Sequence, residues 1–596
     1  MMNIRYKFFI IFMLAVWSII CLRLFVINVI NHEYYEKFAE KNALKTEVLL
    51  PIRGVIMDRK DEPLAVNELG FSISLLPKIR DKSIIESEIN YITYFLPHLD
   101  KDELLDIYAK GNHIYNHAPI ELVRFVPYVE MLKVYAYLKR SPYIILATNT
   151  RRFYPNETSA SHVIGYVSKA NNKDMQDNPL SVYSKVIGKD GIEKTYNGYL
   201  QGEAGYRKTQ INSLYKETKL LQEDNVLKRN DLRLSLDLRL QESIDREFVD
   251  KYGAVIVMDV HNGEILAAGS YPEYNINYFV DGISHKNWQE LTDNIHKPLI
   301  NKLVYGRYPP GSVIKMGMLL SFLEFANITE NTTIQTPPFV ELGGRKFRDW
   351  KASGHGSADA IKAIRESVDV YFYLLSQKAG IENTANVLRQ MGLGELTGVD
   401  IPNEVSGILP TPEWKLRRYG EQWYNGDTLT TSIGQGYFLA TPMQIARYTA
   451  LIASGKLVTP HFVKDFNGEA AHFEIKDVLS EFQKSKLDVL RKGMYQVCSI
   501  PGGTAFYRTQ GTQVSLACKT GTAQVVGIPQ DIQRRVREVD MEYFHRSHAW
   551  ITAFLPYENP QYSITILIEH GGSVGSNGPL LVKIANKLKE LGYIQK

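Results

Sequence analysis

The sequence YPPGSVIK (residues 308–315) runs directly into MGMLLSFLE (residues 316–324), and together they predict a sharp turn followed by a buried helix. Two prolines and a glycine end an extended segment and turn the chain. The residues after the turn are apolar on nearly every face, which is typical of a helix that is buried all round. Ser312 therefore lies at the open N-terminus of that helix, where unpaired backbone N–H groups point outward. Lys315 lies three residues further on and on the same face.

A serine and a lysine in this arrangement can act as a nucleophile and its base. A serine hydroxyl is a weak nucleophile until a neighbouring base takes its proton, and an unprotonated lysine can do so. The helix N-terminus would stabilise the developing negative charge. The alternative is that Ser312 is an ordinary N-cap. The pattern S-x-x-K alone does not decide between them, because a second copy occurs at Ser213–Lys216 in a polar segment without a buried helix behind it.

Length and composition describe a folded protein of several domains. A chain of 596 residues is too long for one hydrophobic core and indicates two to four domains. A net charge of +4 is close to neutral at this length and gives no indication of nucleic-acid binding. The three cysteines, Cys21, Cys498 and Cys518, indicate neither a disulfide framework nor a zinc site.

The N-terminus predicts a membrane anchor, with residues 1–31 as cytoplasmic tail and transmembrane helix. The apolar run 8–30 is long enough to span a bilayer, and Arg23 near one end can extend to the interface. Arg5 and Lys7 precede the run, which places the N-terminus in the cytoplasm and the rest of the chain outside. No small-residue cleavage site follows, so the anchor is expected to be uncleaved. The alternative is a buried core helix.

Residues 32–230, which we call the pedestal, predict an α+β domain. Short strands surround a turn at Lys60-Asp61, and a small α+β insertion is expected at about residues 70–150. Several charged residues and one glycine of the pedestal are expected to form ion pairs and turns rather than to act in catalysis: Arg53, Gly54, Asp58, Arg59 and Glu193.

Residues 231–596, the C-terminal domain, predict a mixed sheet flanked by helices. Two apolar strands surround the turn His261-Asn262-Gly263, an Asn-Gly hairpin signal. Three more strands and a terminal helix follow a long helical middle. The fold class is therefore mixed α/β, with a single N-terminal transmembrane helix, a pedestal and a larger domain built on one sheet.

The triplet Lys519-Thr520-Gly521 ends the apolar strand VSLAC (514–518) and predicts a carboxylate-binding element. Glycine lets a ligand approach the strand closely, while lysine and threonine supply a cation and a hydroxyl group. A simple turn at the end of a strand would explain the residue types but not the apolar strand before them. The triplet and the pair Ser312/Lys315 are together a stronger signal than either alone.

A further serine is expected between these motifs, two residues before an Asn or Asp. Ser357 and Ser367 both qualify, because Asp359 and Asp369 follow them. Ser357 has the features of an N-cap for the helix that follows it. Ser367 falls between two predicted helices, and we favour it because capping already accounts for Ser357.

The segments SVIK, SVD and KTGT resemble the three active-site motifs of penicillin-binding proteins and serine β-lactamases. The similarity covers nearly the whole chain after residue 48, apart from residues 70–150. It extends to the class B, membrane-anchored transpeptidases through RGVIMDR (53–59), GIEKTY (191–196) and MDVHNGEILAAGSYPEYN (258–275). SVD in place of S-x-N, IGQGYFLATPMQIAR (433–447) and HAWITAFLP (548–556) resemble the penicillin-binding protein 2 type of the rod-elongation machinery.

The resemblance implies a peptidoglycan D,D-transpeptidase. Ser312 would attack the carbonyl between the last two D-alanines of a stem peptide, with Lys315 as base. Backbone N–H groups of Ser312 and Thr522 would form the oxyanion hole. Ser367 would pass the proton to the leaving D-alanine.

The resemblance also implies how the substrate is held. Lys519, Thr520 and Thr522, with Gly521 between them, would bind the terminal carboxylate. Asp369 would orient the two lysines without exchanging a proton itself. The transferred acyl group would then be taken by the amine of a second stem peptide.

The expected partners are stem peptides ending in D-Ala-D-Ala, β-lactams, the membrane, a SEDS-family glycosyltransferase and other elongation-complex proteins. No nucleic acid, metal or cofactor is expected. Some family members carry zinc on a site built partly from cysteine, but this chain has only Asp349 and His355 in that region. The implied location is the inner (cytoplasmic) membrane, single-pass, with the catalytic domain periplasmic. The alternatives are a D,D-carboxypeptidase using the same site, or mainly a scaffold that activates a glycosyltransferase.

Overall fold

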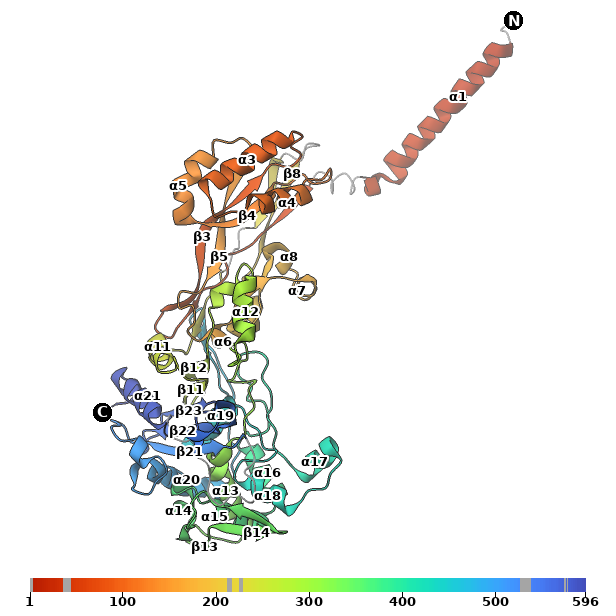
Figure 1. Ribbon diagram of the computed structural model, residues 1–596. Coiled ribbons are helices and arrows are strands. Elements are labelled where there is room, and N and C mark those ends of the chain that lie inside the picture. Colours follow the sequence, from red (N-terminus) through yellow and green to blue (C-terminus); the bar gives the residue numbers. More distant parts are fainter. Residues whose placement is uncertain are drawn as a thin grey trace.

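A computed structural model describes residues 4–35, 44–211, 217–224, 229–525, 537–572, 575 and 577–595. Figure 1 shows an elongated body with the pedestal at one end and the C-terminal domain at the other. The N-terminal helix α1 projects away from both, and the C-terminus lies in the C-terminal domain.

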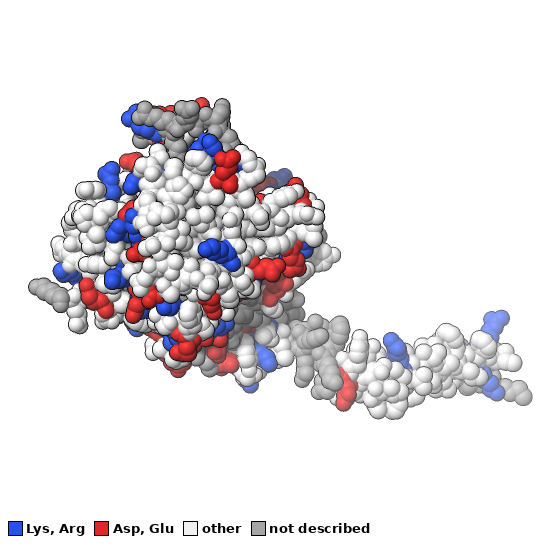
Figure 2. Space-filling view, turned by 90° about the horizontal axis from the view of Figure 1, so that it is seen from below, with Lys and Arg blue, Asp and Glu red and all other residues white. Residues whose placement is uncertain are grey.

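The N-terminal helix has the properties of a membrane anchor. The α-helix α1 (Ile4–Phe25) continues into the π-helical turn η1 (Val26–Ile30), giving 27 residues that include an 18-residue stretch with a mean hydropathy of 2.7. None of these residues is buried against the described remainder of the chain. In Figure 2 the helix is an almost uncharged rod with basic side chains at its far end. The alternative of a buried core helix is therefore wrong, and the predicted single membrane-spanning anchor fits.

A seven-stranded sheet joins the pedestal to the C-terminal domain. Six strands follow the order β19-β18-β10-β2-β3-β4, and the seventh strand, β5, also pairs with β3. Strands β10 and β2 are parallel and the remaining pairs are antiparallel. The strands are β2 (Ile56–Met57), β3 (Pro63–Leu75), β4 (Ile120–Pro127), β5 (Ile144–Phe153), β10 (Leu232–Leu234), β18 (Val463–Phe466) and β19 (Glu469–Ala470). The predicted turn at Lys60-Asp61 separates β2 from β3, and Asp61 has a φ of 66°.

Three helices cover the far end of this sheet, as the α+β pattern of residues 70–150 predicted. They are α3 (Lys82–Phe95), α4 (Lys101–Gly111) and α5 (Tyr128–Leu138). Their apolar faces and those of β3 and β4 form a hydrophobic core that is separate from the main one and includes Ile89, Met131 and Leu138. This end of the pedestal therefore has its own source of stability.

The rest of the pedestal consists of short elements. Strands β1 (Leu44–Leu49), β8 (Gly205–Ile211) and β9 (Glu217–Asp224) form a three-stranded sheet, and β6 (Val167–Lys169) pairs with β7 (Val186–Gly188). The short helices are α6 (Ser161–Ile164), α7 (Asn172–Asp177), α8 (Ser181–Ser184), α9 (Gly191–Thr195) and α10 (Asn197–Leu200). Residues 191–200 thus form two short helices, α9 and α10.

Ion pairs at the centre of the pedestal confirm the structural role predicted for its charged residues. Glu193 is fully buried and binds Arg53 Nη2 at 2.5 Å and Arg152 Nε at 2.6 Å. Gly54 is required next to this cluster, because a Cβ there would lie 1.8 Å from the carbonyl oxygen of Asn230. Asp58 is also buried, and its carboxylate accepts the backbone N–H of Leu238 at 2.9 Å.

The C-terminal domain is built on a five-stranded sheet with the order β12-β11-β23-β22-β21. Its four pairings are antiparallel. The strands are β11 (Gly253–Asp259), β12 (Ile265–Tyr271), β21 (Ala517–Ala523), β22 (His548–Leu555) and β23 (Tyr562–Ile568). The contacting helices are α11 (Leu238–Glu247), α19 (Pro442–Ser454), α20 (Glu481–Ser499) and α21 (Gly578–Glu590). The predicted hairpin, C-terminal strands and terminal helix are therefore confirmed.

The helical middle of the chain surrounds one buried helix, α13 (Lys315–Phe325). It contacts α15 (Asp369–Ala379), α16 (Ile381–Gln390) and α20. The other α-helices are α12 (His285–Asp293), α14 (Ala360–Arg365), α17 (Pro412–Tyr419) and α18 (Asn425–Ser432). The 3-10 helices are η2 (Ile276–Phe279), η3 (Gly311–Ile314), η4 (Phe506–Arg508), η5 (Glu538–Asp540) and η6 (Tyr543–His545). The short strands are β13 (Ile334–Thr336), β14 (Phe339–Leu342), β15 (Arg345–Arg348), β16 (Gly356–Ala358), β17 (Leu457–Val458) and β20 (Ile475–Lys476). Every residue from Lys315 to Leu323 is buried, which confirms the predicted all-round burial of this helix.

The cysteines depart from the prediction of no disulfide. Cys498 and Cys518 form a disulfide with a Cα–Cα distance of 6.0 Å. Cys498 is at the end of α20 and Cys518 is in β21, and these elements pack against each other. No sequence pattern marks such a pair, because it depends on how a helix lies on a strand. Cys21 in α1 stays free.

Candidate active site

The turn before Ser312 is held against strand β21. Gly311 has a φ of 57°, and a Cβ at this position would lie 2.9 Å from the carbonyl oxygen of Thr522. The N–H of Gly311 donates to the carbonyl oxygen of Gly434 at 2.9 Å. The indole Nε1 of Trp550 donates to the carbonyl oxygen of Pro309 at 3.0 Å. The first and last motifs of the sequence are thus brought together by close backbone packing that only glycine allows.

A buried tyrosine, which sequence reasoning missed, fixes the first turn of α13. The N–H of Gly317 donates to Tyr448 Oη at 2.6 Å, and that hydroxyl donates to the carbonyl oxygen of Ile314 at 3.2 Å. Both groups belong to the helix that carries Lys315. Tyr448 therefore helps to set where Ser312 and Lys315 point.

Lys315 is fully buried and its ammonium group is completely engaged. Nζ donates to Oδ1 of Asp369 at 2.6 Å, to the carbonyl oxygen of Ser367 at 3.0 Å and to Ser367 Oγ at 3.2 Å. These partners come from the turn between α14 and α15. The structure thus brings together four of the predicted site residues, since Ser312 lies on the same helical turn.

Ser367 bridges the two lysines. Its Oγ lies 3.2 Å from Lys315 Nζ and 2.9 Å from Lys519 Nζ. Its backbone adopts a φ of 54°, which costs about 1 kcal/mol for a residue other than glycine. The hydrogen bonds from Ser367 N–H to Ile364 and from Val368 N–H to Ala363 hold this conformation.

Lys519 is buried in β21 beside Ser367. Burial lowers the pKa of Lys519 well below that of an ordinary lysine, the positive charge of Lys315 lowers it further, and the negative charge of Asp369 partly opposes both effects. Nζ also donates to the carbonyl oxygen of Thr520 at 2.9 Å. The charged form of Lys519 is therefore less favoured than that of an exposed lysine.

The remaining residues of the last motif line the same edge of the sheet. Thr520 Oγ1 lies 2.7 Å from Thr504 Oγ1. A Cβ on Gly521 would lie 3.0 Å from Val313 Cγ1 and 3.1 Å from the carbonyl oxygen of Pro310. Gly521 therefore makes room for the residues of the first motif. The sequence had predicted that this glycine makes room for a ligand.

A second buried network, also missed from the sequence, supports the Ser367 turn. Asp349 Oδ2 accepts the N–H of Val370 at 3.1 Å, and Oδ1 lies 3.0 Å from His355 Nε2. His355 Nδ1 lies 2.8 Å from Glu366 Oε2. Burial works against a charge on His355, but the hydrogen bonds to Asp349 and Glu366 outweigh it and raise its pKa.

This network does not fit a metal site. Both ring nitrogens of His355 are hydrogen-bonded to carboxylates, so neither is directed at a common point with Asp349. Among the described residues, no group of three His, Cys, Asp or Glu side chains is arranged to hold a metal ion.

Ser357, the alternative to Ser367, does not have the capping role predicted for it. Ser357 lies exposed in the short strand β16, and Asp359 is the N-cap of α14, accepting the N–H of Lys362 at 2.8 Å. The prediction that Ser357 caps this helix is therefore wrong by two residues. The second S-x-x-K copy, Ser213–Lys216, lies outside the described residues.

A serine at a helix start, next to two buried amines that one hydroxyl group bridges, is suited to acyl transfer. Residues 253–590 match the family described as "Penicillin binding protein transpeptidase domain", and residues 48–234 match "Penicillin-binding Protein dimerisation domain". The chain belongs to the penicillin-binding protein transpeptidases.

Full-length relatives of this penicillin-binding protein are close in both sequence and structure. It is 32% identical to "Peptidoglycan D,D-transpeptidase MrdA" of Salmonella typhimurium over 96% of this chain and 94% of the relative. It is 52% identical to a chain of the complex between penicillin-binding protein PBP2 and MreC from Helicobacter pylori, with a TM-score of 0.85 over 92% of this chain and 99% of that chain. A chain from a peptidoglycan synthase complex is 27% identical, with a TM-score of 0.70 over 97% of both chains.

Proposed function

We propose that this penicillin-binding protein is the peptidoglycan D,D-transpeptidase of cell elongation and forms an acyl-enzyme on Ser312. The observation that carries the proposal is the chain of contacts from Lys315 Nζ through Ser367 Oγ to Lys519 Nζ. Lys315 begins α13 and directly follows η3, which contains Ser312. Such a chain can remove the serine proton and return one to a leaving amine.

The first step is to free Lys315 to act as a base. Ser367 Oγ accepts a proton from Lys315 and gives its own proton to Lys519, whose lowered pKa favours the neutral amine before substrate arrives. The carboxylate of an incoming stem peptide stabilises the newly charged Lys519. Substrate binding therefore draws a proton away from Lys315.

The acyl transfer then follows. Ser312 Oγ loses its proton to Lys315 and bonds to the carbonyl carbon between the two terminal D-alanines. The bond to the last D-alanine breaks, and its amine receives the proton from Lys315 through Ser367. The amine of a second stem peptide attacks the ester, forms the cross-link and regenerates Ser312. Backbone N–H groups of Ser312 and Thr522 stabilise the oxyanion in both halves.

Lys519, Thr520 and Thr522 hold the substrate carboxylate, and Gly521 lets their strand lie against the first motif. Asp369 orients Lys315 through the 2.6 Å contact. Thr520 and Thr522 are two residues apart in β21 and so lie on the same face of the strand, where one carboxylate can contact both hydroxyl groups.

The helix α1 anchors the protein in the inner membrane, with both domains on the outer side. Arg5 and Lys7 at the start of the helix support this orientation. The disulfide between Cys498 and Cys518 supports an oxidising compartment. The solved complex of a relative with MreC supports assembly with elongation proteins, and a SEDS-family glycosyltransferase is the partner that would supply glycan strands.

The test of the proposed function is to expose the protein to benzylpenicillin and map the adduct by mass spectrometry. We expect one adduct on Ser312, its loss in Ser312→Ala, and its retention in Ser213→Ala. With a stem-peptide substrate and an acceptor amine, cross-linked product should exceed the hydrolysed one. An adduct on another serine would disprove the mechanism, and hydrolysis alone would indicate a carboxypeptidase.

A further inference from the structure

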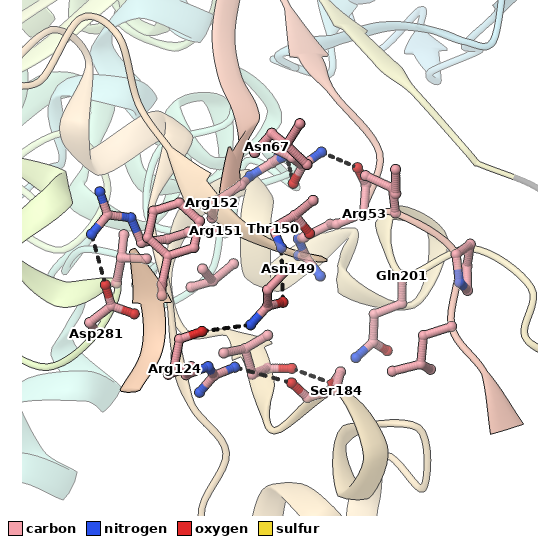
Figure 3. A pocket seen from close by; sticks show the side chains of 18 of the residues that line it. Arg53, Asn67, Arg124, Asn149, Thr150, Arg151, Arg152, Ser184, Gln201 and Asp281 are labelled. Carbon is pink, nitrogen blue, oxygen red and sulfur yellow. Dashed lines mark hydrogen bonds and ion pairs between the residues drawn. The ribbon is translucent and has the colours of Figure 1, made fainter. Parts of the chain in front are cut away.

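Several groups of charged side chains take no part in the mechanism proposed above. One surrounds a cavity of about 500 Å³ in the pedestal, where Arg151 pairs with Asp281 at 3.2 Å (Figure 3). None of the residues that line this cavity belongs to the segments SVIK, SVD or KTGT. Another group, around Glu569 in the C-terminal domain, includes Tyr308, which lies four residues before Ser312. This second group is therefore joined directly to the turn that carries the nucleophile.

Glu569 is held at the centre of the five-stranded sheet. It directly follows β23, which lies between β11 and β22, and its N–H donates to the carbonyl oxygen of Tyr252 at 2.7 Å. The side chain of Glu569 is 17% exposed, and its Oε1 accepts the hydroxyl group of Tyr308 at 2.6 Å. A strand that is paired on both sides belongs to the most stable part of a fold. The carboxylate is therefore a fixed point to which Tyr308 is bound.

Tyr308 is the donor in this contact. The residue is only 8% exposed. Burial raises the pKa of the Tyr308 hydroxyl group well above its ordinary value, and the negative charge of Glu569 and the hydrogen bond to it raise that pKa further. The proton therefore stays on the tyrosine. A hydroxyl group that donates to a carboxylate makes a short and comparatively strong hydrogen bond.

A buried lysine contacts the other oxygen of the carboxylate. Lys302 Nζ lies 3.8 Å from Oε2 of Glu569 and donates to the carbonyl oxygen of His296 at 2.9 Å. Burial lowers the pKa of Lys302, and the negative charge of Glu569 opposes this effect. Each carboxylate oxygen thus has its own partner, with Oε1 at Tyr308 and Oε2 at Lys302. This division fixes the orientation of the Glu569 side chain.

The ring of Tyr308 packs on strand β22 beside the expected oxyanion hole. It lies edge-on to His548, with ring centres 5.3 Å apart, and edge-on to Trp550 at 6.3 Å. In β22 these two residues flank Ala549, which is paired with Thr522 of β21. The backbone N–H of Thr522 is one of the two expected oxyanion-hole donors. Tyr308 therefore ties the turn of the nucleophile to the strands that hold the oxyanion.

The link from Tyr308 to Ser312 is stiff. Pro309 and Pro310 follow Tyr308, and a proline ring fixes the backbone torsion φ, which is −71° at Pro310. The carbonyl oxygen of Pro309 accepts the indole N–H of Trp550 at 3.0 Å, and the ring of Tyr308 packs against that same indole. A displacement of Tyr308 is therefore transmitted along the turn to Ser312.

We propose that Glu569 is a positioning residue for acyl transfer and acts through Tyr308. By holding the tyrosine side chain, the carboxylate keeps Ser312 aligned with the backbone N–H of Thr522. Attack by the serine depends on this alignment, because a misplacement of about 1 Å can lower a rate by about two orders of magnitude. The inference rests on the proposed function, since it concerns the same acyl-enzyme on Ser312.

The test uses the full chain in detergent, mixed rapidly with benzylpenicillin over a range of concentrations. The concentration dependence separates the Kd of the non-covalent complex from the rate constant of acylation. Tyr308→Phe should lower the rate constant about tenfold, the effect of losing one hydrogen bond to a charged group. The Kd should stay nearly unchanged, because the aromatic ring is retained. Glu569→Ala should lower the rate constant by at least as much.

Two comparisons separate positioning from stability. Glu569→Gln should keep the rate constant within about threefold of wild type, because the amide oxygen still accepts the tyrosine hydroxyl group. When Glu569→Ala is added to Tyr308→Phe, the rate constant should fall further by no more than about twofold, because two residues that act through one contact are not additive. Thermal melting of every variant shows whether a change of rate follows a change of stability.

Tyr593→Phe is the matched control. The hydroxyl group of Tyr593 donates to Oδ2 of Asp237 at 2.7 Å, and Arg239 Nη2 lies 2.7 Å from the same oxygen. The variant removes the same kind of hydrogen bond in the same domain, and its rate constant should equal that of wild type.

The inference is overturned by a wild-type rate constant in Tyr308→Phe, by a Glu569→Gln variant as slow as Tyr308→Phe, or by an equally slow Tyr593→Phe. None of these outcomes depends on whether Glu569→Ala folds. If the wild type itself is not acylated on Ser312, the proposed function fails instead.

Discussion

The ammonium nitrogen of Lys315 lies 2.6 Å from Oδ1 of Asp369, inside the protein. An amide at position 369 could both donate and accept hydrogen bonds, whereas an ionised carboxylate only accepts. The carboxylate therefore acts as a hydrogen-bond acceptor that fixes the position of the Lys315 ammonium group. Lys519 sits on the other side of Ser367, where a proton can go.

Substitutions of Asp369 test this arrangement through the pH dependence of acylation. Asp369→Asn should keep the rate of penicillin acylation within about tenfold of wild type, because the amide oxygen can still accept a hydrogen bond from Lys315. Its rise should shift to lower pH, because the negative charge that opposes the lowered pKa of Lys519 is lost. Acylation of Asp369→Ala should be much slower, since the hydrogen bond between position 369 and Lys315 is lost altogether. The rate is measured by stopped-flow mixing between pH 5 and 10. If Asn and Ala are equally damaging, the carboxylate has a chemical role of its own.

Replacing Ser367 should break the bridge between the lysines. Ser367→Ala is expected to slow acylation by about two orders of magnitude, as for the loss of a proton-transfer group. Ser357→Ala is the matched control, and it should leave both acylation and stability nearly unchanged because Asp359 caps α14. The two variants are compared by fluorescent penicillin labelling over time. Slow acylation of Ser357→Ala together with fast acylation of Ser367→Ala would reverse the assignment of the two serines.

His355 should make stability depend on pH. The pKa of His355 in the folded protein is raised by Asp349 and Glu366 despite burial. Its contribution to the stability of the fold is therefore fully present below its unfolded pKa of about 6.5, and it is lost as the pH rises through the folded-state pKa. The difference in melting temperature between wild type and His355→Asn should therefore be larger at pH 6 than at pH 9. Melting is followed by intrinsic fluorescence. An equal difference at both pH values would mean that the histidine is not charged in the folded protein.

The disulfide should be detectable by alkylation. Without reduction, denatured protein should take up one alkyl group, on Cys21, and after reduction it should take up three. Cys498→Ala should cost about 3 kcal/mol of unfolding free energy, the value for a loop of this length. Mass spectrometry gives the alkyl count and urea unfolding gives the stability. Three alkyl groups without reduction, in protein purified from the membrane, would contradict both the bond and the extracytoplasmic location.

Local sequence patterns determined much of the fold. The apolar run of the anchor, the Asn-Gly turn between β11 and β12 and the helix α13 follow from neighbours within a few residues. The residue types of SVIK, SVD and KTGT could likewise be recognised without coordinates. Local patterns suffice here because helix periodicity and turn chemistry act over short stretches.

The tertiary structure decided which of these residues meet, and through which groups. Ser367 reaches both lysines because its backbone takes a φ of 54°, which no local signal indicated. Ser357, with the same short pattern, lies in a strand instead. The contact between Gly311 and Thr522 joins segments about 210 residues apart in sequence, and it depends on the packing of a turn against a strand.

By itself, then, the sequence determined the anchor, the strands and helices and the kinds of chemical group at the candidate site. Only the tertiary structure decided that Asp349, His355 and Glu366 form one network, that Cys498 is bonded to Cys518, and that Glu193 pairs with both Arg53 and Arg152. The physical reason is that burial and pairing of polar groups depend on distances between elements far apart in the chain. Those distances are set by the packing of the cores, which no short window of sequence contains.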